Sequence, residues 1–263
     1  MKNYLLKIEY DGTKYVGWQF QKNGKSIQDA IEIALYRMFK FKIRVIGAGR
    51  TDKGVHANGQ HANFKIDKNI DNKKKFINSI NFFLKENLIS VLDIKKKDLN
   101  FNARFNAKER IYEYKIINRE GALSLGKNQA WHIKKRLDLN LLKQGAKALE
   151  GEHDFSTFRA ASCSAKSPIK KMNSIKIKKQ GELILITFKS KSFLQNQVRS
   201  IVGCLEYLSS KKWTLKYFKK VLNSKKDQNV LLQLLLADCI LKISSIKSKK
   251  DLLLHIFAMN LMK

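Results

Sequence analysis

Residues 47–60, with the sequence GAGRTDKGVHANGQ, combine four glycines with an Arg-Thr-Asp triplet. The segment lies between two stretches that are expected to form strands. Glycine lets a backbone turn tightly or come close to a ligand, so a loop would present the carboxylate of Asp52 and the guanidinium of Arg50. A carboxylate in such a place can act as a nucleophile or as a general base. Asp52 is therefore the first candidate for a residue that does chemistry.

The glycine spacing does not match the phosphate-binding loops. A dinucleotide fingerprint needs a third glycine where Asp52 stands and a helix directly afterwards, and neither condition is met. A P-loop needs a Gly-Lys-Ser/Thr sequence that opens a helix, which is also absent. An acidic side chain would also make a poor phosphate cradle. The structural alternative is an Asx-turn, in which Asp52 only holds a hairpin together.

The segments that must position this loop alternate between strand-like and helix-like patterns. Residues 4–10 alternate as a half-buried strand does, and Ser26 has the character of a helix N-cap. Further strands are expected at 43–46, 60–66, 110–118, 173–179 and 183–189, and further helices at 73–84, from Asp138, at 194–208 and from Thr214. Strands and helices without a regular βαβ crossover indicate an α+β fold, with antiparallel sheets and helices on one face.

The charge balance favours a polyanionic partner. The 263 residues include 53 Lys and Arg against 22 Asp and Glu, a formal net charge of +31 that is spread over both halves. Such a distribution favours nucleic acid first and an anionic membrane second. The alternative is that 44 lysines against 9 arginines only reflect an A+T-rich genome. The candidates for phosphate contacts are lysine clusters at 73–75, 95–97, 134–136, 170–171 and 211–212.

Composition excludes several classes of protein. No stretch approaches the roughly 18 uninterrupted apolar residues of a membrane span, and the opening MKNYLLKIEYDG lacks the apolar core of a secretory signal. The three cysteines give no disulfide framework and no zinc spacing. His56 and His61 lack a third ligand, so no metal site is expected. We expect a soluble cytoplasmic protein.

The loop and several other segments resemble one known family. Residues 49–57, GRTDKGVHA, are similar to the active-site motif of the tRNA pseudouridine synthase A family. The other matching segments follow the family's order and spacing: YDGT and GWQ within 10–19, SIQ at 26–28, ARF and RIYEY within 103–114, GEHDFSTF at 151–158 and QVRSIVG at 197–203. Together they cover residues 4 to about 208, which is most of the chain.

The resemblance implies a pseudouridine synthase fold with two sheet-and-helix halves, rich in antiparallel strands, around a central basic cleft. We expect an N-terminal half at 1–105 that carries the catalytic Asp loop and a C-terminal half at 106–263, packed as one catalytic unit. The implied activity is isomerisation of uridine to pseudouridine in the anticodon arm of tRNA, at positions 38 to 40. In the family this reaction needs neither cofactor nor metal, and the enzymes are homodimers that hold tRNA.

The resemblance also assigns a role to four residues. Asp52 is the essential carboxylate, which either attacks the sugar carbon C1′ or removes a proton from the sugar. Arg199, on the helix at 194–208, is the cation that keeps this carboxylate ionised. Tyr112 stacks on the target base, and Arg50 helps to extrude the nucleotide from its stem. Without the resemblance, Tyr112 would be a core aromatic, Arg199 a surface arginine and Arg50 a salt-bridge residue of its loop.

Two segments depart from the family pattern. Where the family has Pro-Ala-x-Gly-Leu before a final strand, this chain has LLADCILKIS at 235–244, and it has Gln-Asn-Gln at 195–197 where the family commonly has basic or Met-rich residues. The departures concern the C-terminal wall of the site and the RNA contacts, and not Asp52, Tyr112 or Arg199. Two alternatives to an active synthase remain. One is a non-catalytic RNA-binding descendant of the same fold, and the other is an unrelated basic scaffold whose charge reflects genome composition.

Overall fold

The computed structural model describes residues 1–126, 128–224 and 239–245, the last of these by its backbone alone. Its centre is one sheet of 10 strands in the order β4-β1-β3-β10-β5-β9-β8-β7, with β2 beside β3 and β6 beside β5. The strands are β1 (Lys2–Tyr10), β2 (Val45–Gly47), β3 (His56–Ile66), β4 (Ile89–Lys97), β5 (Glu109–Asn118), β6 (Trp131–Ile133), β7 (Gly151–Asp154), β8 (Ile169–Gln180), β9 (Leu183–Ser190) and β10 (Cys239–Ser245). The helices are α1 (Ile27–Phe39), α2 (Lys73–Leu84), α3 (Ala103–Asn106), α4 (Leu139–Ala148), α5 (Gln197–Ser209) and α6 (Leu215–Asn223). The α+β fold class expected from the sequence is confirmed.

The N-terminal part of the sheet is antiparallel and is covered by two helices. β1 lies between β3 and β4 and runs antiparallel to both. α1 begins where the side chain of Ser26 accepts a hydrogen bond from the backbone N–H of Asp29 (3.2 Å), as the sequence predicts. α2 occupies the predicted residues and begins after Asn72, whose side chain accepts from the backbone N–H of Lys75 (2.8 Å).

The C-terminal part of the sheet is also antiparallel in β5, β9, β8 and β7. Asp138 and Thr214 cap α4 and α6, as predicted. α5 is buried along almost its whole length. It packs against α4 at Gly145, where an added Cβ would come within 2.7 Å of Leu205 and Leu208. The glycine therefore lets the two helices approach closely, and α5 becomes the fixed core helix of this part.

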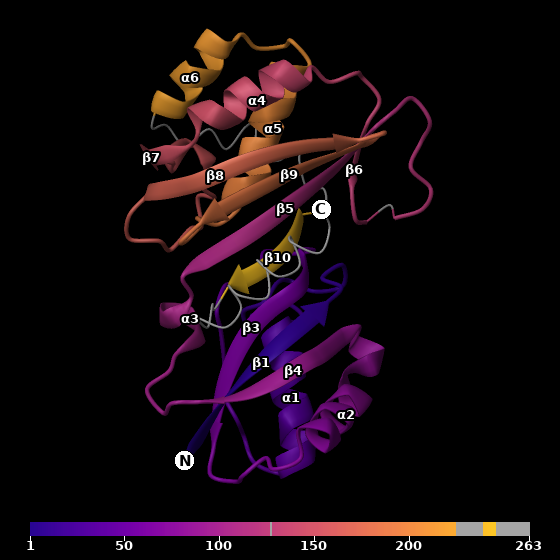
Figure 1. The fold of residues 1–263 in the computed structure, drawn as a ribbon, viewed down its shortest axis with the longest axis vertical. Coiled ribbons are helices and arrows are strands. Elements are labelled where there is room, and N and C mark those ends of the chain that lie inside the picture. Colours follow the sequence, from indigo (N-terminus) through magenta and orange to yellow (C-terminus); the bar gives the residue numbers. More distant parts are fainter. Residues whose placement is uncertain (127, 225–238, 246–263) are drawn as a thin grey trace, which may run out of the picture.

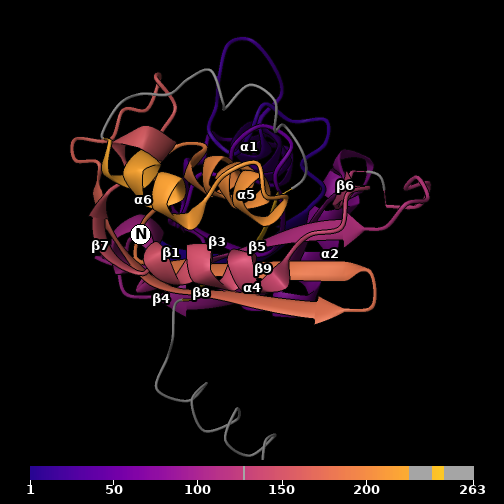
Figure 2. The ribbon, with the colours of Figure 1, turned by 90° about the horizontal axis from the view of Figure 1, so that it is seen from above.

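β10 joins the two parts of the sheet. It runs parallel to β3 and antiparallel to β5, so a strand from near the end of the chain lies in the middle of the sheet (Figure 1). Residues 235–238, the first part of the C-terminal segment that departs from the family pattern, lie outside the described residues. In Figure 2, α1, α5 and α6 lie on one side of β8 and β9. No helix of the described part of the chain is long and apolar enough to cross a membrane.

Several boundaries differ from the sequence-based predictions: β2 spans Val45–Gly47 rather than 43–46, and β8 begins at Ile169 rather than at 173. The starts of β3 and α5 also differ, and both lie beside the Asp52 loop. β3 begins at His56 rather than at Gln60, because residues of weak strand propensity there pair with β1 and β10. α5 begins at Gln197 rather than at Leu194, because Asn196 has a left-handed backbone (φ 60°) that interrupts the helix. Tertiary contacts and one special backbone conformation thus determine where these elements begin.

Candidate active site

The Asp52 loop, residues 48–55, connects β2 to β3 and is held by the chain segment that follows β1. The hydroxyl groups of Tyr10 and Thr51 share a hydrogen bond of 2.8 Å, and both residues are buried. The backbone N–H of Trp18 donates to the carbonyl of Thr51 (3.0 Å). Burial raises the pKa of Tyr10, so its hydroxyl stays protonated. These bonds fix the residue directly before Asp52.

Two glycines allow this close contact between the segment and the loop. A Cβ on Gly12 would lie 2.1 Å from the carbonyl oxygen of Val55, and a Cβ on Gly17 would lie 2.6 Å from that of Thr51. Gly17 also has a φ of +123°, a conformation that other residues rarely adopt. The motifs around 10–19 thus serve the site by supporting the Asp52 loop.

Asp52 lies where the loop meets the start of α5. Its Oδ2 accepts a hydrogen bond from the backbone N–H of Asn196 (3.0 Å), so the carboxylate faces the other half of the chain. This is not the arrangement of an Asx-turn. Burial raises the pKa of the Asp52 carboxyl, and the Asn196 N–H and the charge of Arg199 only partly offset this effect. The site therefore holds a carboxylate whose charged form is destabilised before any ligand binds.

Arg199 projects from α5 towards the same loop. It is 7% exposed, and its Nη2 donates to the carbonyl of Lys53 (2.7 Å). Its charge partly offsets the rise that burial causes in the pKa of Asp52, although the guanidinium itself donates to the backbone of the neighbouring Lys53. The Nε of Arg199 and the Nε2 of Gln197 are buried and have no hydrogen-bond partner in the described part of the chain. The start of α5 thus offers donors beside the carboxylate.

Tyr112 contacts the Asp52 loop at Arg50. The Tyr112 hydroxyl on β5 donates to the carbonyl of Arg50 (3.3 Å), and its half-buried ring packs edge-to-face against Phe193, with centroids 4.8 Å apart. Arg50 is largely exposed. Its partial burial and then the neighbouring Arg104 lower its pKa. The structure therefore brings all four sequence-predicted residues to one loop.

Other residues of the site were not predicted from the sequence. Arg110 donates from Nε to the carbonyl of Ala48 (3.0 Å) and from Nη2 to that of Arg104 (2.9 Å), which joins β5, the loop and α3. Burial and then the Arg104 charge lower its pKa, and Tyr112 partly offsets this. Arg110 belongs to the RIYEY motif, but no pattern gives its partners. The contact of Asn196 with Asp52 could not be predicted from the sequence either, because Asn196 donates through its backbone N–H.

His56 is a support of the loop. Its side chain is buried. The Nδ1 atom lies 3.3 Å from an oxygen of Asp11 and accepts a hydrogen bond from the backbone N–H of Gly12 (3.3 Å). The Nε2 atom lies 2.8 Å from the carbonyl oxygen of Asn128. Within the described residues, no group of three side chains is arranged to hold a metal ion. His56 therefore ties the end of the loop to a segment of the other half.

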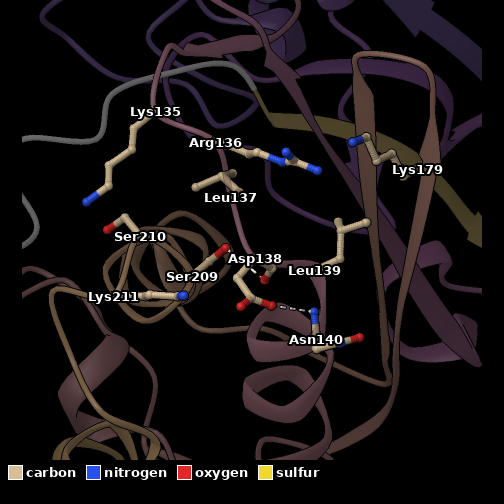
Figure 3. A pocket seen from close by; sticks show the side chains of 10 residues that line it. All are labelled: Lys135, Arg136, Leu137, Asp138, Leu139, Asn140, Lys179, Ser209, Ser210 and Lys211. Atoms are coloured by element: carbon tan, nitrogen blue, oxygen red, sulfur yellow. Dashed lines mark hydrogen bonds between the residues drawn. The ribbon is translucent and has the colours of Figure 1, made fainter.

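A separate basic pocket of about 610 Å³ lies at the far end of α5 (Figure 3). Its cations are Lys135, Arg136, Lys179 and Lys211. Two of the lysine clusters singled out in the sequence, 134–136 and 211–212, thus meet there. None of these four cations pairs with a carboxylate in the part of the chain that is described. Asp138 also lines the pocket, but its Oδ1 accepts from the N–H of Asn140.

A family comparison defines the class of protein. The family model described as tRNA pseudouridine synthase matches residues 7–106 and 146–238, which include the Asp52 loop and the start of α5. The chain thus belongs to the pseudouridine synthase class.

Similar proteins indicate which family within this class the chain belongs to. A protein of Pelagibacter ubique (strain HTCC1062) named tRNA pseudouridine synthase A is 54% identical over 226 residues, 86% of this chain and 92% of the relative. A protein of the same name from Gluconobacter oxydans (strain 621H) is 41% identical, over 86% of this chain and 82% of the relative. Another, from Ehrlichia canis (strain Jake), is 42% identical, over 84% of this chain and 91% of the relative. The chain belongs to the tRNA pseudouridine synthase A family, whose members are isomerases.

Proposed function

We propose that this protein isomerises uridine to pseudouridine in the anticodon arm of tRNA, at positions 38 to 40, with Asp52 as the catalytic carboxylate. One observation carries the proposal. The Asp52 carboxylate lies on a loop fixed by the N-terminal half and accepts a hydrogen bond from Asn196 of the C-terminal half. This contact also supports the proposal that 1–105 and 106–263 act as one catalytic unit around a basic cleft.

The reaction breaks the N1–C1′ glycosidic bond, turns the uracil and forms a C5–C1′ bond. N1 takes up a proton and C5 releases one, so the overall change is an isomerisation. Asp52 acts in its ionised form, either by attack on C1′ or by removal of a proton from the sugar. Both routes fit a carboxylate next to a guanidinium. The reaction as proposed uses neither a metal ion nor a cofactor.

The neighbours of Asp52 favour its ionised form and present the base. Burial raises the pKa of Asp52, and the positive charge of Arg199 partly offsets this rise. Tyr112, fixed through its hydroxyl to the carbonyl of Arg50, stacks on the target base. Arg50 is exposed on the rim of the loop and helps to take the uridine out of the helical stem, since a stacked base is out of reach of the carboxylate.

The charge distribution supports tRNA as the substrate. The formal net charge is +31, and the basic pocket at the end of α5 brings together four cations that form no salt bridge with any described residue. Such a pocket is suited to backbone phosphates. We further propose a cytoplasmic homodimer.

Mapping of the modified positions tests the proposed site of action. Unmodified tRNA transcripts with a uridine at 38, 39 or 40 are incubated with the protein, and pseudouridine is located by carbodiimide labelling and primer extension. We expect pseudouridine at these positions alone, each seen as a stop one nucleotide to its 3′ side. Modification elsewhere in the tRNA would contradict the anticodon-arm proposal, and sedimentation of the protein as a monomer would contradict the homodimer.

A further inference from the structure

A phenylalanine ring is exposed beside the Asp52 loop. Phe105 on α3 has 79% of its surface exposed. The reason is the packing of α3. Ala103 and Ala107 are buried in one cluster with Ala48 of the loop and Leu5 of β1. Phe105 stands between these two alanines in the sequence, and its ring faces solvent rather than this cluster. α3 lies beside the junction of the two parts of the sheet (Figure 1). Its buried side is thus anchored to the candidate active site, and its aromatic side is free.

Three arginines surround this position. Arg110 donates to the carbonyls of both Ala48 and Arg104, which fixes α3 relative to the loop. Arg104 is exposed directly before Phe105, and it is close enough to Arg50 for the two charges to repel. In the described part of the chain, no carboxylate forms a salt bridge with any of the three arginines. Like charges gathered without a counter-charge are typical of a surface that binds a polyanion.

An exposed aromatic ring next to unpaired guanidinium groups fits a nucleotide. The cations attract backbone phosphates, and the ring offers a flat face for a base. We propose that Phe105 is a stacking platform for an RNA base next to the target uridine, with Arg104 and Arg50 holding the flanking phosphates. This inference rests on the proposed function and adds a substrate contact to it.

The platform has a physical role in the reaction. When a uridine leaves a helical stem, the neighbouring base loses a stacking partner, which opposes extrusion. A ring that takes over this contact lowers the cost of the open state. Base–aromatic stacking tolerates different bases because every base has a π-face, so the platform would work in several sequence contexts.

The chain offers a matched control in Phe82. This residue is 66% exposed on α2 and has its own cation nearby, because Lys85 Nζ lies 5.7 Å from the ring centroid. It differs from Phe105 in its position, because α2 packs against β4 and α1, whereas α3 packs against Ala48 of the Asp52 loop. A general effect of losing an exposed aromatic ring would appear in both variants, and a substrate contact would appear only at Phe105.

Two measurements test the platform. In the first, kcat/KM for tRNA is compared in Phe105→Ala, Phe105→Leu, Phe105→Tyr and Phe82→Ala. We expect Phe105→Ala and Phe105→Leu to lose roughly 5- to 100-fold, and Phe105→Tyr to be close to wild type, because the π-face and not apolar size is required. Phe82→Ala should not change. Melting temperatures should be equal, since the Phe105 ring contributes little to the core.

In the second, 2-aminopurine replaces a purine next to the target uridine, and its fluorescence is followed on binding. The base stays quenched with wild type, because it stacks on Phe105, and brightens with Phe105→Ala. Equal brightening with both proteins, or full activity of Phe105→Leu, would overturn the platform. If wild type does not isomerise uridine but the quenching still depends on Phe105, the proposed function fails while the platform stands.

Discussion

Removal of the Tyr10 hydroxyl should loosen the Asp52 loop without disturbing the core. In Tyr10→Phe the ring keeps its place beside Trp18, with centroids 6.1 Å apart, and loses the 2.8 Å hydrogen bond to Thr51 Oγ1. Thr51 is 4% exposed, so water cannot readily replace this partner. A buried hydroxyl without its partner costs about 1–3 kcal/mol. We therefore expect the free energy of unfolding to fall by about 2 kcal/mol.

A double-mutant cycle separates this bond from other effects. Thr51→Val should cost less than Tyr10→Phe, because the Tyr10 hydroxyl keeps its hydrogen bond with the side chain of Gln60. The double variant should lose less free energy of unfolding than the sum of the two single variants, because it contains neither hydroxyl of the pair and so leaves neither of them without its partner. Urea unfolding measures all four proteins, and the slope m should stay constant. The turnover rate should fall with Tyr10→Phe while tRNA affinity is kept, because the bond fixes the residue before Asp52.

Tyr4→Phe is the matched control for this cycle. Tyr4 lies on the same strand, and its hydroxyl also makes hydrogen bonds, to Asn69 Oδ1 (3.2 Å) and from the N–H of Ile70 (2.9 Å), away from the loop. Its loss should lower stability but not turnover. If Tyr4→Phe and Tyr10→Phe reduce turnover equally, general destabilisation explains the result. If Tyr10→Phe matches wild type in both stability and turnover, the idea that this bond supports the loop is refuted.

Two further predictions concern charge. The pKa of Asp52 is raised in the folded protein, so turnover should decline on acidification at a higher pH than for an ordinary aspartate. For the same reason, Asp52→Asn should be more stable than wild type at neutral pH. A decline of turnover only near the ordinary aspartate pKa would contradict the burial of this group. The double variant Lys135→Gln/Lys211→Gln should reduce the slope of log K for tRNA binding against log salt concentration by roughly 2, because both lysines line the pocket at the end of α5. The control pair on α2, Lys74→Gln/Lys75→Gln, should change this slope less. Equal slopes in the two double variants would exclude a special role of the pocket.

Local signals in the sequence predict much of the fold. Ser26, Asp138 and Thr214 cap their helices as expected, since an N-cap depends on nearest neighbours along the chain. The helix at 73–84 is confirmed for the same reason, because its apolar spacing is local. The position of β10 between β3 and β5 is different, since no local pattern reveals which strands a late segment will separate.

The candidate site is predictable only as a set of residue types. The glycine-rich motif and the family resemblance indicate Asp52, but the partner of its carboxylate is a backbone N–H at Asn196, whose left-handed conformation no side-chain pattern signals. Arg199 is indicated in the same way, whereas its bond to the carbonyl of Lys53 depends on how α5 meets the loop. Contacts between distant segments, and the exposure of Phe105, require the three-dimensional structure.

Tritium release from tRNA labelled with [5-³H]uridine tests the central claim most directly. The C5 hydrogen leaves only when C5 becomes the new glycosidic carbon, so release reports the reaction itself. Wild type is compared with Asp52→Ala and with the isosteric Asp52→Asn, without added metal or cofactor, and tRNA binding is measured in parallel. We expect release by wild type alone, with nearly equal tRNA affinity in all three proteins. Release by either variant would contradict the role of Asp52, and tRNA binding without release by wild type would identify a non-catalytic RNA-binding protein.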